Sequence, residues 1–284
     1  MNDKTKNNKV YDFFSNYIFQ TSGIYFKPED YYRLDARLKA LCEHYGLETY
    51  EQLHQKFLTN IGAEMHSKLV DVATNNETYF FRDNKPFDAF SKSVVPELLK
   101  ASPFSKVKIW SCGCSSGQEP YSMLISLIER SVDVSRVEIT ATDISNEILD
   151  KAKSGLYNSI EIQRGLPAPL LIKYFKKEGD LWKISDNLTS KVTFKKFNII
   201  KDLYLSNSYD IVFCRNVVIY QNTENKRFAL TSLFNSLKPD GYLFLGAGES
   251  LIGTKLPYEN VSLNGANIYK KNTSTDSDKE KKTT

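Results

Sequence analysis

The chain has 284 residues, enough for one large domain or for a medium domain with a small companion. Its composition, 41% hydrophobic and 25% charged, is ordinary for a globular protein, and a net charge of +4 is too small and too evenly spread to indicate nucleic-acid binding. No apolar run approaches the roughly 18 residues of a membrane span, so we expect a cytoplasmic protein that does not insert into membranes and whose four cysteines are reduced.

Residues 1–93 follow a helical pattern and predict a small all-helical domain. Within "YYRLDARLKALCEHYG" the apolar residues Leu34, Leu38 and Leu41 recur on one stripe, and Gly46 marks the end of that helix. The alternating pattern of a strand does not occur in this part of the sequence. We place a linker at residues 94–105.

Residues 106–271 change to short strand-like runs separated by helical segments. The strand-like runs are "KVKIWSCG", "RVEITATD", "YDIVFCRN" and "GYLFLGAG", and the helical segments between them are "EPYSMLISLIER", "SNEILDKAKSG" and "TENKRFALTSLFNSLKP". Strands that alternate with helices predict an open, mainly parallel α/β sheet. The stretch "LWKISDNLTSKVTFKKFN" predicts a short antiparallel β excursion that leads back into the sheet, and the polar tail at 272–284 predicts disorder.

The loop "SCGCSSGQEP" follows the first predicted strand, where open α/β sheets bind their ligands. Gly113 and Gly117 allow the backbone to approach a ligand closely. The loop has neither the G-x-G-x-x-G fingerprint of dinucleotide sites nor the lysine of a P-loop. We therefore expect a nucleoside without phosphates as the ligand.

Cys112 and Cys114 in this loop raise the alternative of a metal site. A tetrahedral site needs four ligands at defined spacing, and only Cys42 and His44, in a distant helical segment, are candidates to complete it. We expect no metal and interpret the cysteines as small side chains that let the backbone turn tightly.

Asp143 ends the second predicted strand and is positioned to accept hydrogen bonds from both ribose hydroxyls of a nucleoside. The alternative is that it caps the helix that follows. The glycine loop upstream favours ribose binding. Together these features indicate S-adenosylmethionine, a nucleoside derivative whose site needs a carboxylate to bind the ribose and no phosphate-binding motif.

Three stretches in series resemble the chemotaxis receptor glutamate methyltransferases, the CheR family. They are "NNETYFFRD" (75–83), "SCGCSSGQEPYS" (111–122) and "FCRNVVIY" (213–220), and the similarity extends from the first helices to "GANIYKK". The resemblance implies a class I, Rossmann-like methyltransferase domain joined to a small N-terminal helical domain. It also implies methyl transfer from S-adenosylmethionine, which leaves S-adenosylhomocysteine, to glutamates on the cytoplasmic helical bundle of chemoreceptors.

The resemblance also assigns site residues. Asn76, Thr78 and Arg82 would contact the cofactor from the segment before the sheet, with Gly113 in the cofactor loop. Glu119 would meet the methionine end, Asp143 the ribose, and Asn198 with Ile199 the adenine. Arg215 and Asn216 would close the pocket. Tyr220 would lie near the methyl group and share with Arg82 the task of orienting the substrate carboxylate.

Each of these residues also has a structural interpretation. Thr78 with Asn75 and Asn76 is a candidate helix cap, and Arg82 is a candidate for a surface pair with Asp83. Their joint presence at one edge of the sheet favours the site. Arg33, Arg37 and Lys39 form either a basic docking face for an acidic receptor or a solvated helix face.

The reaction needs no general base, because a free glutamate with a pKa of about 4.3 is already ionised. The antiparallel excursion is short and has only Gly179, whereas relatives that dock on a receptor's C-terminal pentapeptide carry a longer loop there. We therefore expect that the protein works without that tether. We also expect a monomer. Two alternatives remain, a non-catalytic regulator that binds S-adenosylmethionine and a methyltransferase for a different protein carboxylate.

Overall fold

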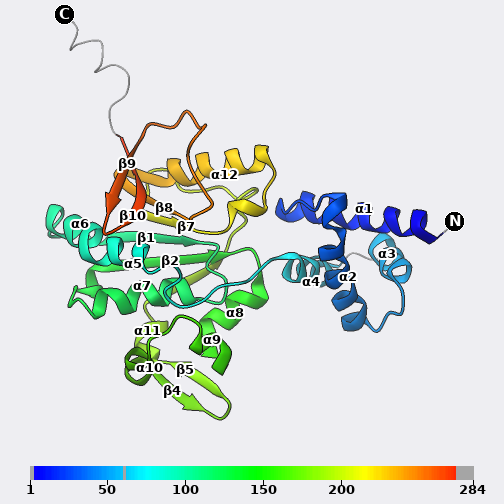
Figure 1. Cartoon of the computed structure of the whole chain (residues 1–284), viewed down its shortest axis with the longest axis horizontal. Coiled ribbons are helices and arrows are strands. Elements are labelled where there is room, and N and C mark those ends of the chain that lie inside the picture. Colours follow the sequence, from blue (N-terminus) through cyan, green and yellow to red (C-terminus); the bar gives the residue numbers. More distant parts are fainter. Residues whose placement is uncertain (1–2, 60–61, 273–284) are drawn as a thin grey trace, which may run out of the picture.

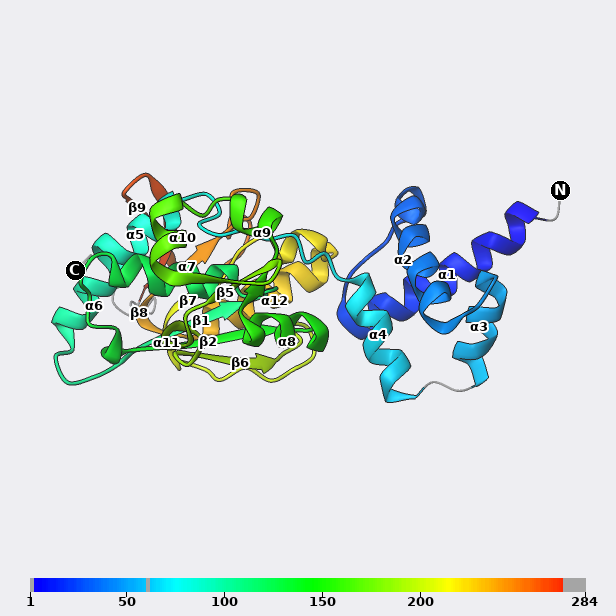
Figure 2. The same ribbon diagram turned by 90° about the horizontal axis from the view of Figure 1, so that it is seen from below.

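The computed structural model describes residues 3–59 and 62–272, so the tail predicted to be disordered lies outside the described residues apart from Asn272. The chain forms a helical unit and a larger unit built on a sheet, joined by an extended segment (Figures 1 and 2). This arrangement confirms the predicted α/β fold with a helical companion.

The helical unit packs around its own apolar core. Leu34, Leu38 and Leu41 are fully buried on one face of α2, as their spacing predicts. Gly46 ends α2 in the left-handed conformation with φ 63°. The helices of this unit are α1 (Asp3–Ser22), η1 (Pro28–Asp30), α2 (Tyr31–Tyr45), α3 (Tyr50–Thr59) and α4 (Ala63–Ala73).

The larger unit contains a seven-stranded sheet in the order β6-β2-β1-β7-β8-β10-β9. The first five strands in that order are parallel, and β10 runs antiparallel to both of its neighbours, β8 and β9. The order reverses between β1 and β7, which is where such sheets bind ligands. The strands are β1 (Val107–Cys112), β2 (Val137–Asp143), β6 (Val192–Lys196), β7 (Tyr209–Cys214), β8 (Leu237–Leu245), β9 (Tyr258–Leu263) and β10 (Ala266–Lys271).

Both faces of the central sheet are buried, because alternate residues of β1, β7 and β8 enter two separate cores. Ile109 packs in the core under α5, α6 and α7, and the next residue, Trp110, packs in the core under α12 (Figure 1). Continuous apolar strands such as "YDIVFC" are typical of a sheet covered on both sides. The main covering helices are α5 (Lys85–Ala89), η2 (Phe90–Val94), α6 (Val95–Ala101), α7 (Gln118–Ile128), α8 (Asn146–Ser154) and α12 (Thr223–Ser236).

A small three-stranded antiparallel sheet, in the order β3-β5-β4, confirms a short antiparallel excursion before the chain returns to the main sheet. Of the stretch that predicts it, only β5 belongs to this sheet, because β6 pairs in parallel with β2. It projects from the lower edge of the larger unit in Figure 1. Its elements and the remaining short helices are η3 (Val134–Arg136), β3 (Leu156–Tyr157), α9 (Ser159–Gln163), α10 (Ala168–Tyr174), β4 (Phe175–Glu178), β5 (Leu181–Ile184), α11 (Asp186–Thr189) and η4 (Val218–Tyr220).

The boundary that the sequence predicts at residue 93 is wrong, and so is the linker at 94–105. The core of the helical unit ends at Ala73, whereas Phe87, Phe90 and Val94 are buried against the sheet. Helical periodicity shows that a segment buries one face but not which unit that face meets. The extended connection between the units instead lies between α4 and α5.

None of the helices in the described ranges is long and apolar enough to cross a membrane.

Replacing Phe90 by alanine tests this boundary. Its ring is fully buried, with its centroid 5.4 Å from that of Phe213 in β7, so the change should cost about 3–5 kcal/mol of unfolding free energy. Chemical denaturation followed by tryptophan fluorescence reports on this unit, because Trp110 and Trp182 both lie in it. Phe104, which is fully exposed, provides the matched control, and Phe104→Ala should change the value by less than about 0.5 kcal/mol. Equal effects of the two changes would contradict the packing.

Candidate active site

A pocket lies at the carboxyl ends of β1, β2 and β7, and it is closed on the far side by the connecting segment and the helical unit. Cys112 and Asp143 are the last residues of β1 and β2, and both line it. All ten residues predicted to bind the cofactor, together with Tyr220, line this one pocket. They are Asn76, Thr78, Arg82, Gly113, Glu119, Asp143, Asn198, Ile199, Arg215 and Asn216.

The loop after β1 requires small residues. Gly113 has φ 75°, and a Cβ on it would lie 2.3 Å from Cγ2 of Val217. The amides of Gly113 and Cys114 both donate to the carbonyl oxygen of Thr142 at the end of β2 (2.8 and 2.9 Å). Cys112 and Cys114 enter the cores on opposite sides of the sheet and do not converge on a ligand.

Asp143 is buried and fastens two loops together. Its carboxylate accepts hydrogen bonds from the backbone amides of Ser115 (2.9 Å) and Ser145 (3.1 Å). Burial raises the pKa of this carboxyl, and the backbone donors oppose the shift. The residue that caps α8 is Ser145, whose hydroxyl accepts from the amide of Ile148, so the capping interpretation of Asp143 is wrong.

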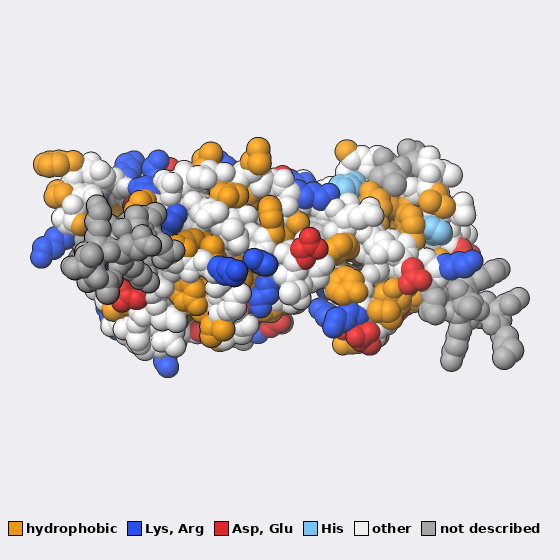
Figure 3. Space-filling view, turned by 90° about the horizontal axis from the view of Figure 1, so that it is seen from above, with side chains coloured by type: hydrophobic (Ala, Val, Ile, Leu, Met, Phe, Trp, Pro, Cys, Tyr) orange, Lys and Arg blue, Asp and Glu red, His pale blue; other side chains and the backbone are white. Residues whose placement is uncertain are grey.

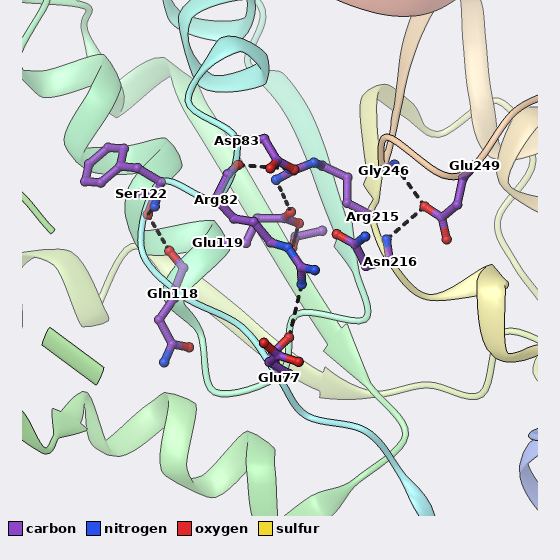
Figure 4. A network of polar contacts seen from close by, with 12 residues as sticks. Glu77, Arg82, Asp83, Gln118, Glu119, Ser122, Arg215, Asn216, Gly246 and Glu249 are labelled. Atoms are coloured by element: carbon purple, nitrogen blue, oxygen red, sulfur yellow. Dashed lines mark hydrogen bonds and ion pairs between the residues drawn. The ribbon is translucent and has the colours of Figure 1, made fainter. Parts of the chain in front are cut away.

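The guanidinium of Arg215 connects three parts of the site (Figure 4). Its Nη2 donates to Oδ2 of Asp83 (2.6 Å) and to the carbonyl oxygen of Arg82 (2.9 Å), and its Nη1 donates to Oε2 of Glu119 (3.3 Å). Only 2% of the Arg215 side chain is exposed. Asp83 therefore pairs with Arg215, and the predicted pairing of Arg82 with Asp83 is wrong.

Arg82 occupies a turn of unusual backbone geometry. Phe81 (φ 54°) and Asp83 (φ 63°) on either side of it both adopt positive φ values that non-glycine residues rarely take. The amide of Phe81 donates to Oγ of Ser122 in α7 (3.0 Å), and Arg215 holds the other end of the turn. The guanidinium of Arg82 lies 5.5 Å from the ring centre of Tyr79, and Nη1 donates to the carbonyl oxygen of Glu77 (3.2 Å).

Glu119 lies in the first turn of α7 with 13% of its side chain exposed. Oε1 accepts from the hydroxyl of Ser111 (2.8 Å), and Oε2 accepts from Arg215. Burial raises the pKa of the Glu119 carboxyl, although both donors act to lower it. The side chain presents a constrained acceptor at the pocket wall.

The helical unit contributes to the pocket through Ser22 and Ile24, a part of the site that the sequence did not reveal. Ile24 forms an isolated antiparallel bridge with Gln221, and the amide of Tyr25 donates to the carbonyl oxygen of Tyr220 (3.3 Å). The side chain of Asn198 donates to the carbonyl oxygen of Thr21 (2.8 Å). That amide is thus engaged in joining the two units.

Further lining residues also escaped the sequence, and Glu77, Tyr79, Ser115 and Gln221 are among them. Glu249, outside the lining, accepts hydrogen bonds from the loop that follows β7. These four lining residues lie within or next to the motifs quoted above, and that position was the sequence signal by which they could have been found. Glu249 had no such signal in the sequence, because its contacts depend on the pairing of β7 with β8 in the sheet.

The three basic residues predicted for docking do not form one face. Arg33 and Arg37 lie one turn apart on α2, with their guanidinium carbons 5.9 and 5.5 Å from the ring centre of Phe26. Arg37 is half-buried and donates through Nε to the carbonyl oxygen of Ala73 (3.1 Å). Lys39 is exposed on another side of the helix, beside Cys42 and Leu47.

The comparisons with known proteins agree with this geometry. The family described as "CheR methyltransferase, SAM binding domain" matches residues 76–266. The chain belongs to the CheR methyltransferase family. "Chemotaxis protein methyltransferase 1" of Pseudomonas aeruginosa is 36% identical over 269 residues, which are 93% of this chain and 98% of that protein. "Chemotaxis protein methyltransferase Cher2" of Pseudomonas putida is 36% identical, with 92% and 98% covered, and the Borreliella burgdorferi "Chemotaxis protein methyltransferase" is 34% identical, with 90% and 91% covered.

This CheR family member is therefore an S-adenosylmethionine-dependent methyltransferase with the predicted class I, Rossmann-like fold. The pocket fits that cofactor on its own evidence. Oδ1 of Asn216 and Oε1 of Gln221 are buried and have no hydrogen-bond partner among the described residues, although both side chains line the pocket. Such orphaned acceptors suit a ligand rich in donors, and the adenine amine, ribose hydroxyls and ammonium of S-adenosylmethionine supply donors.

Ser122→Ala tests whether α7 holds the turn around Arg82. The change leaves the amide of Phe81 without an acceptor and should relax the strained turn, at a cost of ~1 kcal/mol or more. We expect affinity for S-adenosylhomocysteine, measured by calorimetry, to fall about fivefold. Ser126→Ala in the same helix is the control, because that hydroxyl donates only to the carbonyl oxygen of Met123. Unchanged affinity in Ser122→Ala would show that the turn does not depend on this contact.

Proposed function

We propose that this methyltransferase transfers the methyl group of S-adenosylmethionine to glutamate side chains of chemoreceptors and forms methyl esters on their cytoplasmic helical bundle. One observation carries the proposal: the cofactor pocket opens where the helical unit meets the larger unit, a region called the seam below, with Arg82 and Tyr220 in its wall. A second groove starts at this seam and shares Ile24, Tyr220 and Gln221 with the pocket. The names of the relatives, which are chemotaxis methyltransferases over nearly the full chain, support the same conclusion.

The side chains at the seam suit a carboxylate nucleophile, which does not need a histidine as a general base. The three histidines, His44, His54 and His66, all lie in helices of the helical unit, where His66 is hydrogen-bonded to Tyr17 (2.9 Å). A glutamate is already ionised at neutral pH, so it needs orientation and not a base. The bound cofactor supplies an electrophilic methyl group on a sulfonium.

Arg82 and Tyr220 are the residues that we assign to this orientation. The guanidinium of Arg82 offers hydrogen-bond donors to an incoming carboxylate. One of its nitrogens already donates to the carbonyl oxygen of Glu77, which limits how strongly Arg82 binds that carboxylate. The hydroxyl of Tyr220 accepts from Nδ2 of Asn75 (2.6 Å), which fixes the ring beside the pocket. Accurate alignment of the reacting groups lowers such barriers by on the order of 7–11 kcal/mol in well-oriented systems.

The remaining lining residues divide between the ends of the cofactor. Asp143 is assigned to the ribose hydroxyls and Glu119 to the methionine ammonium, because both present buried carboxylate oxygens. Ile199 and the backbone near Asn198 are assigned to the adenine. Asn216 and Gln221 provide the unpartnered acceptors.

The groove beside the seam is the proposed path for the receptor helix. Arg33 and Lys27 line it, whereas Lys39 lies elsewhere on α2. Figure 3 shows Lys and Arg side chains spread over both units, so local position and not a broad basic field must select the partner. The hairpin of β4 and β5 has four-residue strands and a short turn at Gly179, and we propose that methylation does not require a receptor pentapeptide tether.

The decisive experiment is transfer of labelled methyl from S-adenosylmethionine to membranes that contain chemoreceptors of the same organism, followed by mild alkali. We expect label on the receptor band, released as methanol, with equal labelling of receptors that lack their last five residues. Alkali-stable label would contradict ester formation. Cofactor binding without transfer would indicate a regulator, and loss of labelling on truncation would contradict the absence of a tether.

Charge reversal at Arg33 tests the groove. Arg33→Glu should raise the Michaelis constant for receptor about fivefold, because it places a negative charge in the path of an acidic helix, and should leave affinity for S-adenosylhomocysteine unchanged. Lys39→Glu makes the same change of charge on the same helix and should have little effect. Equal effects of the two variants would show that only the overall charge matters.

A further inference from the structure

Glu249 follows β8 in a tight turn and is almost fully buried, with 5% of its surface exposed. Its amide donates to the carbonyl oxygen of Gly246 (2.9 Å), and its carboxylate accepts from the amide of Gly246 (2.9 Å). Gly246 and Glu249 are therefore hydrogen-bonded to each other within the turn, and the carboxylate of Glu249 points toward the loop after β7. Figure 4 shows Glu249 beside Asn216 and Gly246.

Three more backbone amides converge on the same carboxylate. Oε2 accepts from Asn216 (2.8 Å), and Oε1 accepts from Val217 and Val218 (2.9 Å each). Across the described parts of the chain, Glu249 forms no ion pair with a cationic side chain. A buried carboxylate is costly unless it is fully hydrogen-bonded, so these amides are what stabilise its charge.

The segment 216–220, which these hydrogen bonds hold in place, contributes part of the pocket wall. Asn216 adopts φ 60°, which is unusual for a residue other than glycine, and its Oδ1, which has no partner among the described residues, belongs to a side chain that lines the pocket. Val217 packs against the cofactor loop at the point where Gly113 has no Cβ. Tyr220 ends the same short segment at η4. Within the ranges that the structure describes, the backbone amides of Asn216 and Val217 have no other hydrogen-bond acceptor.

We infer that Glu249 is a positioning residue for the cofactor: by gathering the amides of residues 216–218 it sets the strained backbone from which Asn216 and Tyr220 enter the pocket. The inference rests on cofactor binding by this pocket and not on the identity of the methylated substrate. Its test is therefore read out on the cofactor product alone, and a failure of the receptor proposal would leave it untouched.

Glycines of the same turn provide a matched pair of variants. A Cβ at Gly246 would lie 2.8 Å from Oε2 of Glu249, 2.9 Å from the amide nitrogen of Asn216 and 3.0 Å from Nδ2 of Asn216, so the methyl group of Gly246→Ala presses on this hydrogen bond from the side without changing charge. A Cβ at Gly248 meets nothing within 4 Å, so Gly248→Ala is the control. Neither glycine has a positive φ, so alanine is free of backbone strain at both sites.

The first measurement is calorimetric affinity for S-adenosylhomocysteine together with the melting temperature of the full chain. Glu249→Gln, which puts an amide donor against backbone donors, and Gly246→Ala should each weaken binding about tenfold or more, as expected for loss of charge-assisted hydrogen bonds. Gly248→Ala should remain within about twofold of the unaltered chain. Wild-type affinity in a folded Glu249→Gln or Gly246→Ala protein would overturn the inference.

A second measurement separates positioning from general destabilisation. If Glu249 acts through the segment that carries Asn216 and Tyr220, Glu249→Gln combined with Asn216→Ala should lose less affinity for S-adenosylhomocysteine than the sum of the two single losses. Fully additive losses would show that the two residues contribute independently and would overturn the inference as well. Because both single variants are compared as folded proteins, an unfolded Glu249→Gln leaves the Gly246→Ala comparison to decide.

Discussion

The architecture of the site depends on one buried cation. Arg215 brings a guanidinium to the carboxyl end of β7 with 2% of its side chain exposed, and a buried charge of this kind must find partners. It finds Glu119 on α7 and the Asp83 side chain and Arg82 carbonyl of the connecting segment. One side chain thereby fixes a strand end, a helix and the connection between the units in a single arrangement.

The consequence of this arrangement is that the connecting segment becomes part of the active site. The strained turn at Phe81 and Asp83 persists because Arg215 and Ser122 hold it at both ends. The helical unit likewise contributes to the pocket wall, through Ser22 and Ile24. The proposed methylation of a carboxylate needs alignment and exclusion of water and no proton transfer, so it would benefit from a site assembled from both units.

The sequence predicted what depends on local pattern. The stripe of Leu34, Leu38 and Leu41, the strand runs and the position of Asp143 at a strand end follow from periodicity and from the rules of parallel sheets, and the structure confirms them. The residues assigned through the family motifs converge on one pocket.

What the sequence did not predict depends on tertiary contacts. Phe90 follows a helical pattern that is compatible with either unit, so the boundary was misplaced. Asn198 is an amide whose partner, the carbonyl oxygen of Thr21, is 177 residues away. Glu249 acts on backbone amides, which have no sequence signature.

The most direct test of the account is a crystal structure of the chain with S-adenosylhomocysteine bound. We expect the ribose at Asp143, with the contacts of Arg215 with Asp83 and the Arg82 carbonyl still in place beside the ligand. A ligand bound in this pocket with Arg215 released from the connecting segment would contradict the claim that this cation organises the site.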